Sequence, residues 1–524
     1  MPHDCSFPLP RRRLLQAAAL AAGVPAAGAA PAAEPAPLQI TGPWEINGLA
    51  PATSGYLFLR MQVAETLVGA ADDGTPAPAL AERWSVSADG RDWRFVLRPG
   101  ARFHDGTPVT AAAVVRCLDA ARVAPALLSA APLRAVEADG PRTVVLRLDR
   151  PHGALLARLA HSSTIVLAPS SYRPDGRVAA IVGSGPYRVT ALAAPQRVET
   201  AVFDGFDGPP PAVRQVRYLT ASRAETRALM AESGQADLAY GLDPVSLQRL
   251  RRRPQLRIAS VTLPRTALVK VNAGHPALRD PRVRQALSLA IDRTGIARAL
   301  LREPDLAATQ LLPPVLAGWH DPALAPLGFD TAGARRLLEE AGWRPAGGDH
   351  IAGLLGPGGT PLELTLRTFV DRPELPVIAA ALQEQWRQAG VAVRVAIGNS
   401  GDVPLGHRDG SLQLALIARN YATVPDPTGT LAQDFGPQGG DWGAMGWHDD
   451  RVIAALRTLA GAPLPPGQVQ ALRRQVAAVL QAELPLIPVA WYRQQVAVSQ
   501  RLQDVSLDPL ERSYRLDRMR WSAA

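Results

Sequence analysis

The sequence predicts an α/β protein with large sheets of mixed strand direction. Three observations support this: strand-like alternation of apolar side chains in the first third, capped helices in the second half, and strands that directly follow such helices. The chain has 524 residues, enough for two or three domains with sizeable cores. The same order of elements would also suit an α+β arrangement.

Two segments carry the pattern of a strand that is buried on one face. In residues 92–97, Trp93, Phe95 and Leu97 share a face, and residues 143–148 repeat the alternation. A glycine-containing turn follows the first segment. We therefore expect both segments to be strands.

Capping residues mark the helices of the second half. Asp280 is a good N-cap for a helix over residues 281–291, and a second helix over residues 331–341 is stopped by Gly342. A third helix is predicted over residues 376–388, with a strand immediately after it.

The charge composition argues against a nucleic-acid partner. The net charge is +9, but Lys270 is the only lysine among 56 basic residues, and the arginines mostly alternate with acids instead of forming blocks. Hydrophobic residues make up 47% of the chain, which is ordinary for a globular protein.

The N-terminus predicts export. Three arginines at residues 11–13 precede an apolar run at residues 17–24 and two candidate cleavage sites, at residues 27–29 and 30–32. Residues 1–29 are therefore expected to be a twin-arginine-type signal peptide, with residues 30–37 as a flexible leader. An uncleaved anchor is the alternative, and no later stretch is long and apolar enough to span a bilayer.

Cysteine placement suits a periplasmic protein without a lipid anchor. Cys5 lies before the apolar run, so it cannot be a lipidated cysteine that follows one. Cleavage leaves Cys117 as the only cysteine, which excludes an internal disulfide.

Local signatures of catalysis are missing. The sequence has no phosphate-binding glycine loop, no H-E-x-x-H or C-x-x-C motif and no nucleophile elbow, and its nine histidines are scattered. We predict a binding protein that needs no cofactor. Triads need not be local in sequence, so a dispersed active site stays an alternative.

Several ordered motifs resemble the family 5 extracellular solute-binding proteins of bacterial ABC importers, which serve peptide and nickel transport. The most specific is residues 79–109, where an aromatic strand is followed by two glycine turns. The others, in family order, are residues 183–187 (Gly-Ser-Gly-Pro-Tyr), 234–237, 280–293, 330–343 and 485–488.

The resemblance implies two lobes with mixed sheets and an extra subdomain in lobe one. Lobe one would comprise residues 38–267 and 489–524, and lobe two residues 268–488, with crossings near 269–272 and 487–491. A solute would bind in the cleft, and the lobes would close over it by a hinge motion. An inner-membrane ABC permease would then receive it from the monomeric protein.

The resemblance also suggests a cleft loop at residues 419–427, where Arg419, Asn420, Tyr421 and Thr423 become candidate ligand contacts. Peptide-binding members often carry an aspartate in this loop, at the position that Thr423 takes here. A hydroxyl cannot neutralise a peptide ammonium as a carboxylate does.

Nickel-binding relatives are similar at Trp44, Tyr56 and Tyr421. Residues 159–169, where such relatives would carry an arginine, contain none here, and His161 is a candidate contact in that segment. The later loop has Trp442 and His448, with no clearly aligned histidine. The transported solute is therefore predicted to be a small peptide or a metal (nickel) chelate, with no metal ligands assigned.

Two other functions remain open on the same scaffold. A secreted hydrolase would need a reactive set such as Ser162, His161 and Asp426. A periplasmic chaperone or sensor would need no importer.

Overall fold

The computed structural model describes residues 36–123, 127–348, 353–370, 372–422, 424–462 and 464–522. The predicted signal peptide and most of the leader lie outside the described residues, as does Thr423. Residues 37–524 form one compact unit.

A ten-stranded sheet runs through this unit in the order β16-β15-β17-β12-β18-β11-β1-β10-β9-β8. Its strands are β1 (Leu38–Gly42), β8 (Tyr187–Ala193), β9 (Arg197–Val202), β10 (Gln215–Thr220), β11 (Leu238–Ala239), β12 (Leu256–Val271), β15 (Glu363–Phe369), β16 (Ala392–Gly398), β17 (Leu414–Asn420) and β18 (Leu486–Ser499). Strand β1 is parallel to β10 and β11, and β15 to β16 and β17, while the other pairs are antiparallel. The predicted mixed sheet is thereby confirmed.

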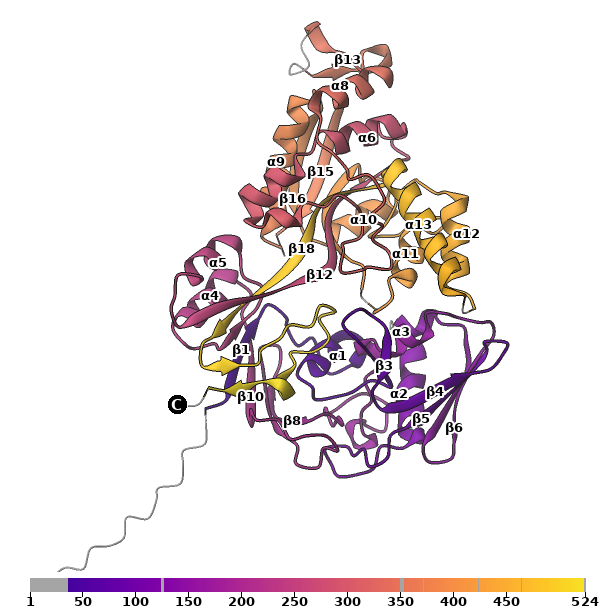
Figure 1. Cartoon of the computed structure of the whole chain (residues 1–524), viewed down its shortest axis with the longest axis vertical. Coiled ribbons are helices and arrows are strands. Elements are labelled where there is room, and N and C mark those ends of the chain that lie inside the picture. Colours follow the sequence, from indigo (N-terminus) through magenta and orange to yellow (C-terminus); the bar gives the residue numbers. More distant parts are fainter. Residues whose placement is uncertain are drawn as a thin grey trace, which may run out of the picture. The chain divides into compact units, whose positions relative to one another are not determined.

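Strands β12 and β18 are the longest, and they pair side by side (Figure 1). Their register shifts between Leu263 and Thr266 and again between Ala267 and Leu268. Such irregularities bend a strand and redirect the side chains at the bend. The predicted lobe boundaries are not fixed by this observation and stay a prediction.

A separate four-stranded sheet, ordered β4-β5-β7-β6, lies in lobe one. Its strands are β4 (Ala81–Val86), β5 (Asp92–Leu97), β6 (Leu133–Asp139) and β7 (Thr143–Leu148), and α2 (Ala111–Val123) contributes to the same core. Both predicted strands coincide with β5 and β7, and Trp93, Phe95 and Leu97 are buried as expected. This sheet matches the expected extra subdomain.

The three predicted helices of lobe two are present as α6 (Pro281–Leu289), α8 (Thr331–Glu340) and α9 (Glu374–Gln388). The Asp280 carboxylate accepts a hydrogen bond from the Arg282 backbone, as the predicted cap requires. Helix α9 begins two residues earlier than predicted.

The remaining helices are α1 (Pro51–Arg60), α3 (Leu155–Leu159), α4 (Ala224–Glu232), α5 (Pro244–Leu250), α7 (Arg293–Ile296), α10 (Asp402–Arg408), α11 (Thr428–Asp434), α12 (Asp450–Leu459) and α13 (Pro466–Glu483). Short strand pairs are β2 (Val68–Ala70) with β3 (Pro76–Pro78), β13 (Arg344–Pro345) with β14 (Leu354–Leu355), and β19 (Leu502–Gln503) with β20 (Arg520–Trp521). Within the part of the chain that the structure describes, no helix has the length and apolar character to cross a membrane.

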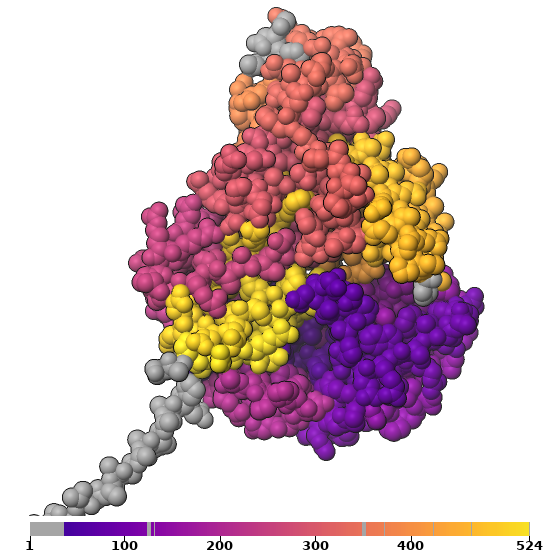
Figure 2. Space-filling view, viewed as in Figure 1, coloured from indigo at the N-terminus to yellow at the C-terminus, as the bar shows by residue number. Residues whose placement is uncertain are grey.

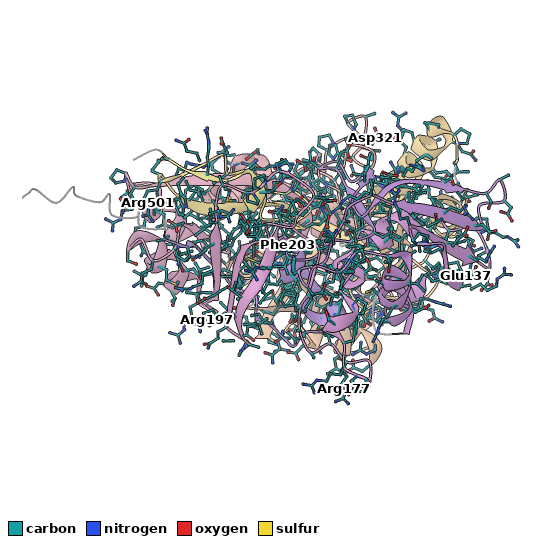
Figure 3. All side chains as sticks on the ribbon, turned by 90° about the horizontal axis from the view of Figure 1, so that it is seen from below. Glu137, Arg177, Arg197, Phe203, Asp321 and Arg501 are labelled. Carbon is teal, nitrogen blue, oxygen red and sulfur yellow. The ribbon has the colours of Figure 1, made fainter. Side chains whose placement is uncertain are left out.

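Surface arginines pair with acids that are near in sequence or on a neighbouring strand. Arg177 and Arg197 project outward in Figure 3, and each lies 3.7 Å from a carboxylate oxygen two residues away in sequence. Glu137, also labelled there, pairs with Arg147 at 3.1 Å. Exposed pairs of this kind contribute little to stability.

Candidate functional site

Charged side chains from distant segments meet beside the irregular part of β12 and β18. We call Arg60, Arg265, Arg372, Glu374, Tyr492 and Glu511 the hinge cluster. Arg265 lies on β12 and Tyr492 on β18, the two long strands. By the predicted boundaries, Arg60 and Glu511 belong to lobe one, while Arg372 and Glu374 belong to lobe two. If these boundaries hold, the cluster combines residues of both lobes with residues of the two long strands.

Arg265 is the centre of the cluster. It lies between the paired residues Leu263 and Thr266, where the register with β18 shifts. Its Nη2 donates to the Glu511 carboxylate at 2.6 Å, and both side chains are about nine-tenths buried. Burial lowers the pKa of Arg265, while the charge of Glu511 opposes this effect.

Arg60 ends helix α1 and brings two predicted aromatic residues into the site. Its guanidinium carbon lies 4.3 Å from the ring centroid of Trp44 and 5.5 Å from that of Tyr56. Its Nε donates to the Glu511 backbone carbonyl at 2.7 Å. The Tyr56 hydroxyl donates to the Glu45 carbonyl at 2.6 Å, which fixes this ring.

Two guanidinium groups lie near the ring of Tyr492. The guanidinium carbons of Arg265 and Arg372 are 5.0 and 5.2 Å from its ring centroid. Arg372 also donates to the Tyr492 hydroxyl at 3.1 Å. Burial, with a further contribution from the charge of Glu374, raises the pKa of Tyr492 above its ordinary value, so the phenol stays protonated.

A tight loop presents Glu511 to the arginines. The buried carboxylate of Asp508 accepts hydrogen bonds from the backbone nitrogens of Leu510, Arg512 and Ser513 at 2.9 to 3.1 Å. Glu511 has a φ of 56°, a left-handed conformation that costs free energy in a residue with a side chain. Burial would raise the pKa of Glu511, but the charges of the three arginines hold it below its ordinary value.

The lobes also contact each other away from the hinge cluster. The Gly153 nitrogen of lobe one donates to the Ala460 carbonyl of lobe two at 2.8 Å. A Cβ on Gly74 would lie 2.5 Å from the Pro425 carbonyl oxygen. In Figure 2 the violet surface of lobe one meets the gold surface of lobe two near α12. Segments that the prediction assigns to different lobes therefore contact each other at these two points.

The predicted loop after β17 lies partly beside the hinge cluster. Asn420 pairs with Arg265 between β17 and β12, and the Tyr421 nitrogen donates to the Pro264 carbonyl at 2.8 Å. The Tyr421 side chain is fully buried, and its hydroxyl has no hydrogen-bond partner among the described residues. Their contact with a solute stays a prediction.

Arg419 has an ion-pair partner inside lobe two. Its Nε and Nη2 donate to the two oxygens of the buried Asp434 carboxylate at 2.8 and 2.7 Å. Such a pair holds β17 against α11, and removing one partner leaves a buried charge. The structure thus gives Arg419 a structural contact, while its predicted contact with a solute is not tested.

His161 and Trp442 each make a contact within the protein. The Nδ1 of His161 accepts from the Ser163 nitrogen at 3.1 Å and caps a short 3₁₀ helix. Burial lowers its pKa to about 4, so its imidazole is neutral at physiological pH. Trp442 packs edge-on against Phe369 with ring centroids 6.4 Å apart. No group of three His, Cys, Asp or Glu suited to a metal ion occurs among the described residues.

Sequence reasoning missed Arg60, Arg265, Arg372, Tyr492 and Glu511. One signal was available for Arg265, because it is a charged residue within the largely apolar strand β12. The others carry no local pattern, since each lies in a different segment of the chain.

The chain is similar to proteins of one known family. Residues 75–442 match the model of the bacterial extracellular solute-binding proteins, family 5 Middle. The nickel-binding periplasmic protein of Escherichia coli (strain K12) is 26% identical over 492 residues, which cover 90% of this chain and 92% of that protein. The glutathione-binding protein GsiB of the same strain is 27% identical over 62% of this chain and 61% of its own length.

Solved structures share the fold. NikA from Brucella suis, in complex with Fe(III)-EDTA, superposes with a TM-score of 0.84 at 24% identity, covering 93% of this chain and 100% of that one. The oligopeptide-binding protein AppA from Bacillus subtilis, in complex with a nonapeptide, gives 0.76 at 17% identity, covering 93% and 99%. At these identities the likeness concerns the fold.

Proposed function

Because the chain belongs to the bacterial extracellular solute-binding proteins of family 5, we propose that it captures a small solute at the hinge cluster and passes it to an ABC permease. Family members bind solutes for ABC importers, so the prediction of a binding protein in place of an enzyme is confirmed. The hydrolase alternative is therefore set aside.

The observation that carries the proposal is the position of the hinge cluster. It lies on β12 and β18, the two strands predicted to connect the lobes, and it draws charged side chains from segments assigned to both of them. A solute bound there would contact both lobes at once, and it would therefore favour the closed state over the open one.

The charges of the cluster favour a solute with a carboxylate. Three arginines face two glutamates, so the fully ionised cluster has a formal charge of 3 − 2 = +1. Relatives are named for nickel and for glutathione, and NikA was solved with an iron chelate. We propose a small peptide or a metal chelate as the solute of this chain.

Aromatic side chains would form the walls of this site. Trp44 and Tyr56 contact Arg60 directly, which supports their predicted role. The other proposed contacts with the solute are Arg419, Asn420, Tyr421, Thr423, His161 and Trp442.

We also propose that the protein is exported by the twin-arginine route and acts as a monomer in the periplasm. The arginines at residues 11–13 and the apolar run after them support the export step. Replacing the arginines at residues 11–13 by lysines should leave the protein in the cytoplasm. Normal export of that variant would contradict the twin-arginine route.

Two measurements test solute capture. Native mass spectrometry of protein purified without refolding should reveal a bound small molecule. Small-angle scattering of protein stripped of solute should show compaction when that molecule is returned. A protein that retains nothing and never compacts in a periplasmic extract would contradict the proposed function.

A further inference from the structure

The only lysine of the chain is buried where three segments of the predicted second lobe meet. The Nζ of Lys270, on β12, lies 2.8 Å from the Gly440 carbonyl oxygen, 3.0 Å from that of Asp441 and 2.8 Å from Nδ1 of His407. His407 belongs to α10, and the two carbonyls belong to the loop of residues 436–446, which follows α11. Lys270 therefore connects this loop to α10.

The contact between Lys270 and His407 accommodates a single hydrogen. Two nitrogen atoms at 2.8 Å form a hydrogen bond when one donates and the other offers a lone pair. A lysine ammonium can donate to an unprotonated Nδ1, and a neutral amine can accept from a protonated Nδ1 while its own hydrogens reach the two carbonyls. When both groups are fully protonated, two hydrogens and two positive charges face each other, so the contact breaks.

Among the residues that the structure describes, the carboxylates near this pair already have arginine partners. The charged groups that act on Lys270 and His407 are Asp434 of α11, Arg419 of β17, Asp441 of the loop and Arg408 of α10. Asp434 pairs with Arg419 at 2.7 Å, and Asp441 pairs with Arg408 at 2.6 Å. A second positive charge on the pair is therefore poorly compensated. Burial, with a further contribution from the charge of Lys270, lowers the pKa of His407 below its ordinary value.

The loop that Lys270 holds also carries Trp442. The Trp442 ring packs edge-on against Phe369 at the end of β15. The end of the loop is held separately, because the Ala444 nitrogen donates to the Asp434 carbonyl at 2.8 Å. Loss of the Lys270 contacts would therefore release the middle of the loop, with Trp442, and leave its end in place.

We propose that Lys270 and His407 form an acid-sensitive switch: their contact holds the middle of the 436–446 loop at neutral pH, and uptake of a second proton by the pair releases it. His407 is half-buried, so a proton from the solvent can reach it. The switch itself does not depend on the proposed function. One consequence rests on that function: if Trp442 contacts the solute, affinity should fall as the pH falls.

Hydrogen exchange of the full chain at two pH values, about 6.5 and about 5, tests the switch. Exchange of peptides from residues 436–446 is divided by that of the same peptides in unfolded protein, which removes the effect of pH on the chemical rate. In the released loop His407 regains its ordinary pKa of about 6.5, so the relative exchange rate should increase about tenfold at the lower pH. The pKa of Lys270 is about 7, so this group keeps most of its proton at both pH values. Peptides of α12 should not change.

Two substitutions of histidine by asparagine separate the switch from other effects of acid. His407→Asn places an amide oxygen near the position of Nδ1, and this oxygen can accept from Lys270 at either pH. The increase in exchange should therefore be absent from this variant. His448→Asn is the matched control, since the exposed His448 follows the same loop and should keep the full increase. Lys270→Met removes the contacts with both carbonyls, so the relative exchange rate should be high at both pH values.

An exchange rate in the loop that does not change with pH in the wild type would overturn the proposal. So would an increase that persists in His407→Asn, or an equal increase in the peptides of α12, which would indicate a wider unfolding. A Lys270→Met variant with wild-type exchange at the higher pH would show that other contacts hold the loop. These measurements use no solute, so their failure leaves the proposed function standing, and a failure to capture a solute leaves the switch standing.

Discussion

The guanidinium of Arg265 donates to the carboxylate of Glu511 at 2.6 Å, although the two residues are 246 positions apart in the chain. This contact ties the connecting strand β12 to the loop after β18. It is buried, and Glu511 accepts it from a left-handed backbone position that the Asp508 carboxylate stabilises. The pair therefore connects the stability of the protein with the place where we propose that a solute binds.

Removing one partner of this pair should destabilise the protein strongly. Arg265→Ala leaves the Glu511 carboxylate buried without its main counter-charge, which typically costs about 3–5 kcal/mol. Urea denaturation should show a lower midpoint with an unchanged slope. Arg387→Ala is the control, because that arginine belongs to an exposed ion pair and should leave the midpoint in place. A small effect of Arg265→Ala would mean that water reaches Glu511.

The contact between the two predicted lobes should depend on Gly153. A Cβ there would lie 2.9 Å from the Gly461 carbonyl oxygen, and the Gly153 nitrogen donates across the lobes to Ala460. Gly153→Val should keep the lobes apart and weaken solute binding by about tenfold, while each lobe stays folded. Scattering with and without solute measures the closure. Gly401→Ala, at a site with no atom within 4 Å of the added Cβ, should close normally.

The protein should become more stable as the pH rises from about 7 to about 9.5. Burial lowers the pKa of Lys270 to about 7, although its ammonium donates to two backbone carbonyls and to His407. In that range the unfolded chain keeps a proton on Lys270 that the folded protein has lost, so stability increases with pH. The gain from this group should be about 1–3 kcal/mol.

Unfolding measured in urea at several pH values checks this dependence. Lys270→Met removes the titrating group, so the rise between pH 7 and 9.5 should disappear in that variant. A slope that persists in Lys270→Met would assign the effect to other groups.

Tyr421→Phe separates a structural role from a binding role. The hydroxyl is buried without a partner among the described residues, so its removal should leave stability unchanged or raise it by up to about 1 kcal/mol. If the hydroxyl contacts the solute, affinity should fall by about tenfold. Calorimetric titration measures the affinity, and thermal unfolding measures the stability. Unchanged affinity would remove Tyr421 from the site.

The sequence by itself determined the class of protein and many of its elements. Strands β5 and β7 and the cap at Asp280 follow from rules that act over a few residues: apolar alternation and side-chain hydrogen bonds to the nearby backbone. The ordered motifs then identified the family, which the match over residues 75–442 confirms.

Only the tertiary structure decided which charges meet. The sequence alone does not distinguish Arg419 from a residue that contacts the solute. Folding places the buried Asp434 carboxylate beside it. Arg60, Arg265 and Glu511 carry no shared motif, and the folded sheet brings them together from three distant segments. Electrostatic interactions depend on distance in space and on burial, and neither quantity can be read from spacing along the chain.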